Sequence, residues 1–323
     1  MRAIIYNKYG NADVITAQDV SVPSPKPNEV RIKVRAASIN SWDWDLLTGQ
    51  PFVTRLDGGM RQPKYRILGA DVAGVIESVG ADAKHYRPGD AVFGDLSGCG
   101  WGAFAEYVCA REDALSLKPA GMSYEDAAAL PQAGVLALQG LREAGTLREG
   151  QQVLLNGAGG GVGTLALQMA KSAGAVVTVV DTKEKLELLR SLGADRVVDY
   201  TREDYARNGH RYDLIVDVMG TRSTTAIKRA LQPGGAYVMI GGEMSRIFQA
   251  MIMSALTNRL SSKKIKVLYH RQSRADQDAL ADLFLERKLK PIIDRIYPLE
   301  ETREAMRYYG EGRAVGKVII AIE

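Results

Sequence analysis

The stretch Val153-Leu-Leu-Asn-Gly-Ala-Gly-Gly-Gly-Val-Gly163 joins an apolar strand to a helix through a glycine-rich turn. Gly157 permits the tight turn, and Gly163 lets the helix pack closely against the sheet. Gly160 and Gly161 let the backbone approach a pyrophosphate, which would lie on the N–H groups at the positive end of the helix. The stretch therefore predicts a dinucleotide-binding loop.

Two features decide how specific this signal is. The spacing is G-x-x-G-x-x-G rather than the commoner G-x-G-x-x-G, so a purely structural glycine-rich turn is the alternative. Asp181 ends the next expected strand, 18 residues after Gly163, where a carboxylate can accept hydrogen bonds from an adenosine ribose. For Asp181 alone, an ordinary helix N-cap before Lys183 is the alternative. We count Val162 among the cofactor-binding residues of the loop.

From Gln152 onward, expected strands alternate with helices, the pattern of a parallel sheet built from βαβ units. Leucines at helical spacing predict a helix over residues 182–192. The expected strands are Val153–Leu155, Val176–Val180, Arg196–Val198, Leu214–Asp217, Ala236–Ile240 and Ile265–Leu268. Six such strands complete a doubly wound parallel sheet.

The residues before this predicted sheet have a different sequence pattern. Short strands broken by Pro, Gly and Asp predict an antiparallel, partly closed β-structure. Ser123 resembles the N-cap of a helix that continues through residues 127–141. The expected elements of the tail are a helix Asp276–Arg287, a strand Pro291–Ile296, a helix Glu300–Tyr309 and a strand Lys317–Ile322. Because the central sheet is already complete, this tail should return to the first domain. The predicted α/β chain thus has domains 1–124 and 125–270 and a return segment 271–323.

Composition excludes several classes of protein. The chain has 323 residues, of which 46% are hydrophobic, 25% charged and 7% aromatic, and this excludes disorder, collagen-like repeats and coiled coil. The net charge is +4 and the densest basic stretch is Arg259–Lys266. Charge alone is a weak signal, so we expect no nucleic-acid partner.

The cysteine content and the length of the apolar runs indicate in which cellular compartment the protein resides. Cys99 and Cys109 are the only cysteines, and no C-x-x-C occurs. A four-cysteine zinc site is therefore excluded, and the usage suits a reducing compartment. Residues 1–10 have a strand pattern rather than that of a signal peptide, and no apolar run approaches 18 residues. We expect a cytoplasmic protein without a membrane span.

Several further motifs follow one another in order. They are Ala37-Ser-Ile-Asn40, Asp43-Trp44, Gly69-Ala-Asp-Val-Ala-Gly74, Pro88-Gly-Asp90, Gly102-Ala-Phe-Ala-Glu-Tyr107, Leu130-Pro131, Leu192-Gly-Ala-Asp195, Tyr212-Asp213 and Gly316-Lys317. With the glycine loop, they make nearly the whole chain resemble the medium-chain dehydrogenase/reductase superfamily. The closest resemblance is to its zinc-independent quinone oxidoreductase branch, including reticulon-interacting and chloroplast-envelope homologues. This resemblance implies a GroES-like catalytic domain split around a Rossmann domain.

The resemblance also bears on metal chemistry. The zinc-dependent relatives bind catalytic zinc through Cys, His and Cys, and the matching positions here are Asn40, Ala70 and Ala133. None supplies a thiolate or imidazole, so we expect no metal site. Without zinc, a substrate that already accepts hydride well is favoured, such as a quinone or an α,β-unsaturated carbonyl.

Substrate contacts are implied by position in the family. Asn40 is the best candidate for a contact beside the nicotinamide, and satisfying a local turn is its alternative role. Trp42 would stack on a flat substrate ring, whereas Trp44 is expected in the core. Asp43 is expected to be structural rather than an acid or base. Tyr65 is a weaker candidate for a proton donor.

The choice of nicotinamide cofactor rests on opposing signals. Lys185 and Tyr200 match positions that meet the 2′-phosphate of NADPH in the relatives. Asp181 should repel that phosphate and favour the free ribose of NADH, and we expect this charge to outweigh one exposed lysine. Alternatively, Lys185 is a solvated charge on the surface of its helix and does not contact the cofactor. Gly241, after the fifth strand, completes the expected NAD(P)H-binding residues.

Two polar positions near the nicotinamide ring are apolar in this chain. The usual Thr is Leu136, and the usual Asn after Asp217 is Val218. The first hypothesis is an NAD(P)H-dependent reductase of quinones or enones. A cofactor-binding structural or interaction protein with little turnover is the second, and a dedicated biosynthetic enone reductase is the third. The family resemblance also implies a homodimer that pairs through the edge strand Lys264–Tyr269.

Overall fold

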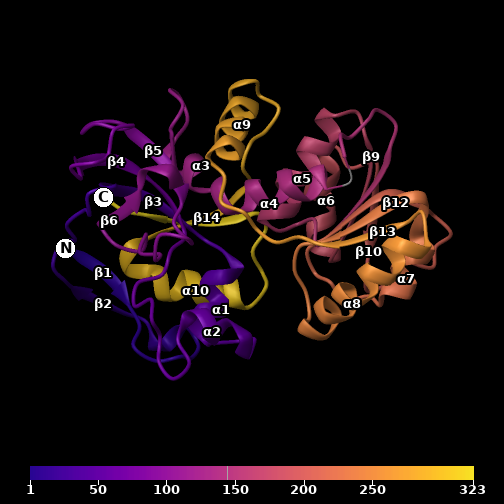
Figure 1. Cartoon of the computed structure of the whole chain (residues 1–323), viewed down its shortest axis with the longest axis horizontal. Coiled ribbons are helices and arrows are strands. Elements are labelled where there is room, and N and C mark those ends of the chain that lie inside the picture. The colour runs from indigo at the N-terminus through magenta and orange to yellow at the C-terminus, as the bar shows by residue number, and fades with distance from the viewer. Residues whose placement is uncertain (144) are drawn as a thin grey trace. The chain divides into compact units, whose positions relative to one another are not determined.

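The computed structural model describes residues 1–143 and 145–323, without the side chain of Leu256 (Figure 1). Its contacts form two compact units. The first unit comprises Met1–Val135, Gln272–Leu285 and Pro291–Glu323, and the second comprises Leu136–Arg271 and Glu286–Lys290. The expected boundary at residue 124 differs from this division, because helix α3 (Tyr124–Ala128) packs against strands of the first unit.

The second unit is built on a six-stranded sheet in the order β10-β9-β8-β11-β12-β13, and all neighbouring strands run parallel. The strands are β8 (Gln152–Asn156), β9 (Val176–Asp181), β10 (Arg196–Asp199), β11 (Tyr212–Asp217), β12 (Leu231–Met239) and β13 (Lys264–Val267). The order reverses between β8 and β11, as in a doubly wound sheet. The predicted Rossmann sheet is confirmed.

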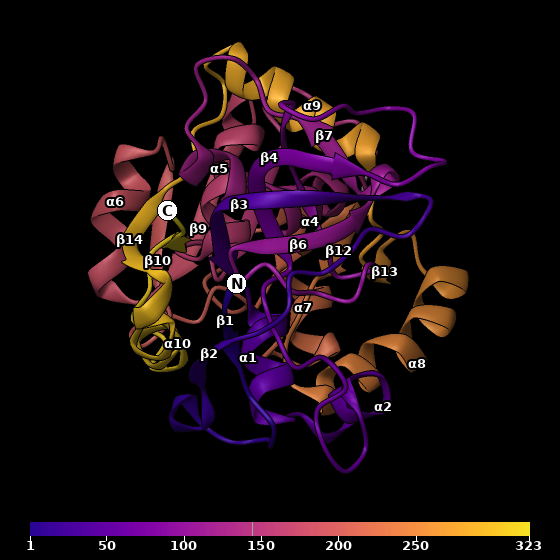
Figure 2. The same cartoon turned by 90° about the vertical axis from the view of Figure 1, so that its left-hand side faces the viewer.

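Helices cover both faces of this sheet. Figures 1 and 2 show α5 (Gly161–Ser172) and α6 (Leu186–Ser191) on one face and α7 (Thr224–Ala230) and α8 (Met244–Leu260) on the other. The helix expected over residues 182–192 begins as a 3-10 turn, Lys183–Lys185, before α6. Every strand contributes at least one buried residue to the core, among them Leu154, Val180, Val198, Ile215, Tyr237 and Ile265.

The first unit contains a seven-stranded sheet in the order β14-β15-β3-β4-β5-β7, with β6 also paired to β3. Its strands are β3 (Glu29–Ile39), β4 (Asp71–Val79), β5 (Ala91–Asp95), β6 (Tyr107–Arg111), β7 (Leu115–Leu117), β14 (Ile293–Pro298) and β15 (Lys317–Ala321). A separate hairpin consists of β1 (Arg2–Ile5) and β2 (Thr16–Asp19). Among the described strands of this unit, β14 and β15 are the one pair that runs parallel. The tail therefore returns to strand β3, which lies between β4 and β6 in Figure 2.

The helices of the first unit differ from the expected ones in one place. The helix expected after Ser123 is two helices, α3 and α4 (Pro131–Arg142), because the residue before a proline disfavours helical geometry. Residues of α4 up to Val135 belong to the first unit and those from Leu136 to the second. Ser123 Oγ caps α3 by accepting a bond from Asp126 N at 3.0 Å. The others are α1 (Ser41–Thr48), α2 (Arg55–Gly58), α9 (Arg274–Leu285) and α10 (Thr302–Gly310). Among the described residues, no helix is both long and apolar enough to cross a membrane.

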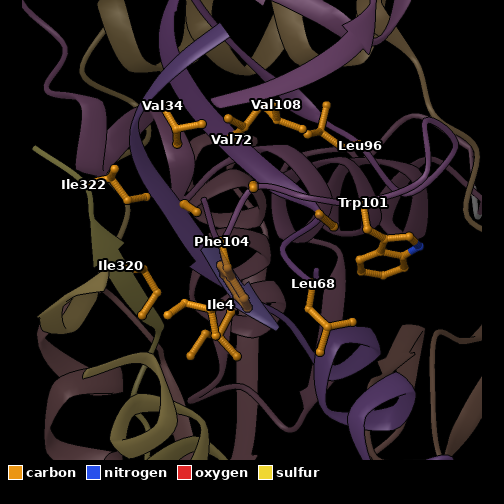
Figure 3. Packing of buried hydrophobic residues seen from close by; sticks show 14 of the residues in the cluster. Ile4, Val34, Leu68, Val72, Leu96, Trp101, Phe104, Val108, Ile320 and Ile322 are labelled. Carbon is orange, nitrogen blue, oxygen red and sulfur yellow. The ribbon is translucent and has the colours of Figure 1, made fainter. Parts of the chain in front are cut away.

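Strands from both ends of the chain share the core of the first unit. Figure 3 shows Ile4 from β1, Val34 from β3 and Ile320 from β15 together with Phe104, and all four side chains are buried. Phe104 lies outside any strand, in the segment before β6, which begins at Tyr107. Phe104 instead bonds to Leu68 O and Ile4 N by its backbone. These two backbone hydrogen bonds connect strand β1 of the hairpin to the segments that precede β6 and β4.

A buried ion pair links strands of the sheet next to this core. Lys317 Nζ, at the start of β15, lies 3.3 Å from Asp71 Oδ2, at the start of β4, and their side chains are 3% and 0% exposed. Asp71 Oδ2 also accepts bonds from Ser38 Oγ and Asn40 Nδ2, at 2.8 and 2.9 Å. Burial raises the pKa of the Asp71 carboxyl, and the Lys317 ammonium opposes this shift. The ion pair thus connects β3, β4 and β15.

Replacing Lys317 should test this network. We expect Lys317→Met to lower the free energy of unfolding by about 3–5 kcal/mol, because Asp71 would remain buried without a cation. Urea denaturation followed by circular dichroism measures the loss. The double variant Lys317→Met/Asp71→Asn should recover a large part of it, since no uncompensated charge remains. A loss below about 1 kcal/mol in the single variant would contradict the structural role of the pair.

Candidate functional site

The glycine loop of the second unit has the geometry of a dinucleotide cradle. Gly157 follows β8 with φ +79°, a conformation that favours glycine, and its N–H donates to Val180 O at 3.0 Å. A Cβ on Gly163 would lie 2.4 Å from Ala158 Cα. Because that distance is far below van der Waals contact, only glycine lets α5 pack so closely on the loop.

Space remains open at the start of α5. Gly160 is the N-cap, and the nearest atom to a Cβ built there is Gly157 O at 3.9 Å. The first N–H groups of a helix have no partner within it, and they include those of Gly161 and Val162. An uncovered helix start with positive partial charge suits a pyrophosphate. The residues present therefore fit a dinucleotide.

The predicted ribose-binding residues gather beside this loop. Asp181 ends β9 and is 8% exposed. Its oxygens accept bonds from Gly159 N at 2.7 Å and Thr182 N at 2.9 Å. A Cβ on Gly159 would meet Lys185 Cδ at 2.5 Å, so the Lys185 side chain lies against the loop. Tyr200 is half exposed, and its N–H donates to Asp181 O at 3.3 Å.

A second buried carboxylate shapes the carboxyl ends of β11 and β12. Asp217 accepts bonds from Asn156 Nδ2, Gly220 N, Met219 N and Tyr237 Oη, at 2.7 to 3.0 Å. Burial raises the pKa of the Asp217 carboxyl, and these bonds oppose the shift. The contacts fix the loop after β11 at the reversal point of strand order, where doubly wound sheets bind ligands.

The remaining predicted cofactor residue lies next to that loop. Gly241 follows β12, and a Cβ there would lie 2.8 Å from Val218 O. Met219 is 53% exposed, and its Cγ would lie 2.8 Å from a Cβ on Gly157. The structure therefore brings the Gly157 turn, Met219 and Gly241 to one edge of the sheet. Sequence reasoning missed Asn156 and Tyr237. Asn156 stands in the quoted stretch before Gly157 but is not part of its glycine pattern, and Tyr237 stands in no motif.

Asn40 in the first unit lies inside the polar network of Lys317 and Asp71. It is 6% exposed, and its Oδ1 accepts a bond from Lys317 Nζ at 2.5 Å. Its N–H donates to Asp43 Oδ2 at 2.8 Å, while Asp43 Oδ1 accepts from Gly69 N at 2.8 Å. Burial raises the pKa of the Asp43 carboxyl to about 7, and these two backbone bonds oppose the shift. Asp43 thus connects the start of α1 to the segment before β4.

The three positions that match the zinc ligands of the relatives carry no zinc-binding side chains here. Ala70 and Ala133 have only methyl side chains, and the Asn40 amide oxygen is bonded to an ammonium group. In the part of the chain that the structure describes, no three His, Cys, Asp or Glu side chains are grouped as metal ligands are. The residue beside Ala133 was missed by sequence analysis. Gln132 is 3% exposed and donates its N–H to Asp71 Oδ1 at 2.9 Å.

Aromatic rings surround the exposed tryptophan of α1. Trp42 is 41% exposed, and its ring centroid lies 6.4 Å from that of Trp101. Tyr65 lies 6.2 Å from the same Trp101 ring. Trp44 instead packs on α10, where a Cβ on Gly310 would lie 2.2 Å from its Cη2 atom. Trp101 was not predicted, although glycines on both sides of it were visible in the sequence.

Family models match two parts of the chain. Residues 26–120 match the alcohol dehydrogenase GroES-like domain, and residues 192–320 match a model described as zinc-binding dehydrogenase. The first match lies within the first unit. The second covers strands β10 to β13 of the doubly wound sheet and continues into the return segment of the first unit.

Individual relatives extend over the whole chain. A 2-methylene-furan-3-one reductase of Solanum lycopersicum is 34% identical, covering 99% of this chain and 79% of that protein. A mitochondrial NAD(P)H oxidoreductase, RTN4IP1 of Mus musculus, is 31% identical over 100% and 89%. The solved quinone oxidoreductase of Coxiella burnetii is 29% identical with a TM-score of 0.89, covering 100% and 99%. The chain therefore belongs to the medium-chain dehydrogenase/reductase superfamily, in its quinone oxidoreductase branch.

Proposed function

We propose that this chain is an NAD(P)H-dependent oxidoreductase that transfers hydride to a quinone or an α,β-unsaturated carbonyl. The observation that carries the proposal is the open glycine cradle at the start of α5, with Asp181 and Lys185 beside it. The similar proteins are an enone reductase, an NAD(P)H oxidoreductase and a quinone oxidoreductase. Both the site and the relatives thus favour nicotinamide-dependent reduction of a conjugated acceptor.

The chain's own residues have separate tasks in this proposal. NAD(P)H supplies the hydride when bound. N–H groups of Gly160, Gly161 and Val162 bind the pyrophosphate, and Asp181 binds the adenosine ribose. Asn40 contacts the acceptor or the nicotinamide, since an amide oxygen and an amide nitrogen each have capacity for one bond beyond those already made. Trp42 stacks on the acceptor ring with its exposed face.

The proposed reaction needs no zinc. A quinone or enone that receives hydride becomes a delocalised phenolate or enolate, and solvent can protonate it. The methyl side chains of Ala70 and Ala133 and the engagement of Asn40 by Lys317 support this zinc-free chemistry. The task of the chain is then to hold the acceptor and cofactor in a reactive geometry.

NADH is the proposed cofactor rather than NADPH. A carboxylate accepts about four hydrogen bonds, and Asp181 already accepts two from the backbone. Two sites therefore remain for the hydroxyls of a free ribose. A 2′-phosphate at the same place would meet the negative charge in a site of low exposure.

We further propose a homodimer and a reducing compartment such as the cytoplasm. Strand β13 ends the order of the six-stranded sheet, so its outer edge can pair with a second copy. Exposed apolar side chains accompany this edge, namely Phe248, Met251, Ile252, Leu260 and Tyr269. The thiols of Cys99 and Cys109 are both unpaired by disulfide, which fits a reducing compartment.

The function is tested by mixing the purified protein with NADH or NADPH and adding 1,4-benzoquinone, a naphthoquinone or a simple enone. Loss of nicotinamide absorbance with any acceptor supports the proposal. Cofactor binding without oxidation would favour a structural or interaction protein, for which the apolar Leu136 and Val218 are the motivating observation. Turnover of one enone but not of simple quinones would favour a dedicated biosynthetic reductase.

Asp181→Asn should change the cofactor preference. The change removes the charge but keeps an oxygen that accepts from Gly159 N, so the loop should keep its shape. We expect the KM for NADPH to fall about tenfold and the KM for NADH to rise about tenfold, measured by steady-state kinetics. Asp199→Asn is the matched control, because Asp199 ends the neighbouring strand in register with Asp181. Equal effects of both variants would contradict the role of Asp181.

Two glycine substitutions should separate binding from stability. Gly160→Ala adds a methyl group in open space, so we expect an unchanged melting temperature and a KM for NADH raised about tenfold. Gly163→Ala forces its Cβ against Ala158, and we expect a loss of about 1–3 kcal/mol in unfolding free energy. Steady-state kinetics and thermal denaturation measure the two effects. Normal NADH binding by Gly160→Ala would argue against phosphate binding at this helix start.

A charge on the edge strand should produce monomers. Val267→Glu places a carboxylate on β13, and Tyr269→Lys places an ammonium where the side chain is 84% exposed. We expect both variants to have half the wild-type mass by light scattering, because neither charge is compatible with pairing of two β13 edges. Tyr269→Lys also serves as the control for folding, since its side chain lies outside the core. An unchanged mass in both variants would refute this interface.

A further inference from the structure

Trp101 has an unusual backbone conformation in the first unit. Its φ is +67°, and it lies between Gly100 at +102° and Gly102 at +115°. A bulky side chain rarely adopts a positive φ, so the surrounding structure must hold this conformation in place. Backbone outliers of this kind are concentrated at ligand-binding sites and switches.

The loop around Trp101 supplies that restraint. Trp101 N donates to Leu96 O at 3.2 Å. Gln272 Nε2 donates to Asp95 O at 2.7 Å, and Arg111 Nη1 donates to Gly98 O at 2.9 Å. These bonds reach the loop from the segment before α9 and from the end of β6, so its shape does not depend on its own residues alone. The backbone of the Trp101 loop is therefore held in this conformation.

The indole N–H of Trp101 is buried without a partner. The residue is 5% exposed, and among the described residues its Nε1 has no hydrogen-bond acceptor. Figure 3 shows this nitrogen directed away from the labelled apolar side chains. Buried tryptophans usually satisfy this donor, because an unmade hydrogen bond in a region without water is costly. A ligand oxygen would satisfy it.

The neighbouring rings extend from Trp101 to the surface. Trp42, which is 41% exposed, and the half-buried Tyr65 both lie within 6.5 Å of the Trp101 ring, tilted by 50° and 46°. Trp42 belongs to α1, next to Asp43, and Asp43 bonds to Gly69 N. Gly69 O in turn accepts from Ala103 N in the Trp101 loop, at 3.0 Å. Aromatic rings and polar network are thus parts of one connected structure.

We propose that Trp101 is a specificity-determining residue for the acceptor: its indole N–H donates a hydrogen bond to a carbonyl oxygen of a planar conjugated ligand whose ring packs against Trp42. This inference rests on the proposed function and adds a residue to it. A ligand with the flat ring but without the oxygen would gain the ring contact and leave the N–H unsatisfied. The residue therefore selects for carbonyl-bearing rings.

The test compares two ligands on two variants. The ligands are 2,3-dimethyl-1,4-naphthoquinone, whose methyl groups block addition of thiols, and 2,3-dimethylnaphthalene, which lacks carbonyl groups. Trp101→Phe keeps a ring and removes the N–H, and Trp44→Phe is the matched control in the same unit. Calorimetry on cofactor-free protein should show the quinone bound about three- to tenfold more weakly by Trp101→Phe. The affinity of Trp101→Phe for the hydrocarbon should stay within about twofold of the wild-type value. The affinities of Trp44→Phe for both ligands should also stay within about twofold of wild type. Equal quinone affinity in wild type and Trp101→Phe would overturn the proposal.

A measurement on the unmodified protein avoids dependence on the folding of a variant. The chain has three tryptophans, so 15N-labelled protein should give three indole N–H cross-peaks. We expect the Trp101 peak to move downfield with the quinone and to move less with the hydrocarbon. An unmoved Trp101 peak at saturating quinone would overturn the proposal.

Turnover distinguishes this inference from the proposed function. With the same quinone, Trp101→Phe should raise the KM for the acceptor by the factor seen in calorimetry, with the KM for NADH unchanged. If wild type binds the quinone through Trp101 but oxidises neither NADH nor NADPH, the proposed function fails and the binding role stands. If wild type turns over and Trp101→Phe is kinetically identical to it, the function stands and the role of Trp101 fails.

Discussion

The buried contact between Lys317 and Asp71 is the constraint on which the first unit depends. Groups from β3, β15 and α4 converge on the two oxygens of Asp71. The same ammonium bonds the amide oxygen of Asn40, the residue from which α1 starts. Because a buried carboxylate tolerates few arrangements of its donors, this ion pair fixes where three elements begin. The aromatic side chains of α1 are positioned as a result.

The second unit uses a buried carboxylate in a related way but with different donors. Asp217 accepts bonds from a side-chain amide, a phenol and two backbone N–H groups, all of them neutral. The charge is thus stabilised by dipoles, and the backbone donors come from the loop that follows the strand itself. Asp71 instead has a charged partner, Lys317, which lies 246 residues away in the sequence. Asp217 thus fixes the loop that follows its own strand, whereas Asp71 joins strands from the two ends of the chain.

This difference explains how much could be predicted from the sequence. The glycine loop was predicted because its glycine spacing and the close contact of Gly163 with Ala158 lie within a few residues of sequence. The six parallel strands followed from alternation along the chain. The bond between Lys317 and Asn40 spans 277 residues, so no local pattern indicates it. Asn40 was expected at a ligand because of its place in the family, and its bonds to Lys317 and Asp71 became visible only in the structure.

The return of β15 to β3 has a consequence for synthesis of the chain. A ribosome makes the six strands of the doubly wound sheet, residues 152–267, before it reaches residue 317. During that interval, Asp71 lacks its ammonium partner and β3 lacks its neighbour on the β15 side. The nascent chain therefore holds a complete parallel sheet beside an unfinished antiparallel one. Until β15 is made, the β3 edge over Ala36–Ile39 is unpaired, and exchange of β15 between two chains is a misassembly that this topology permits.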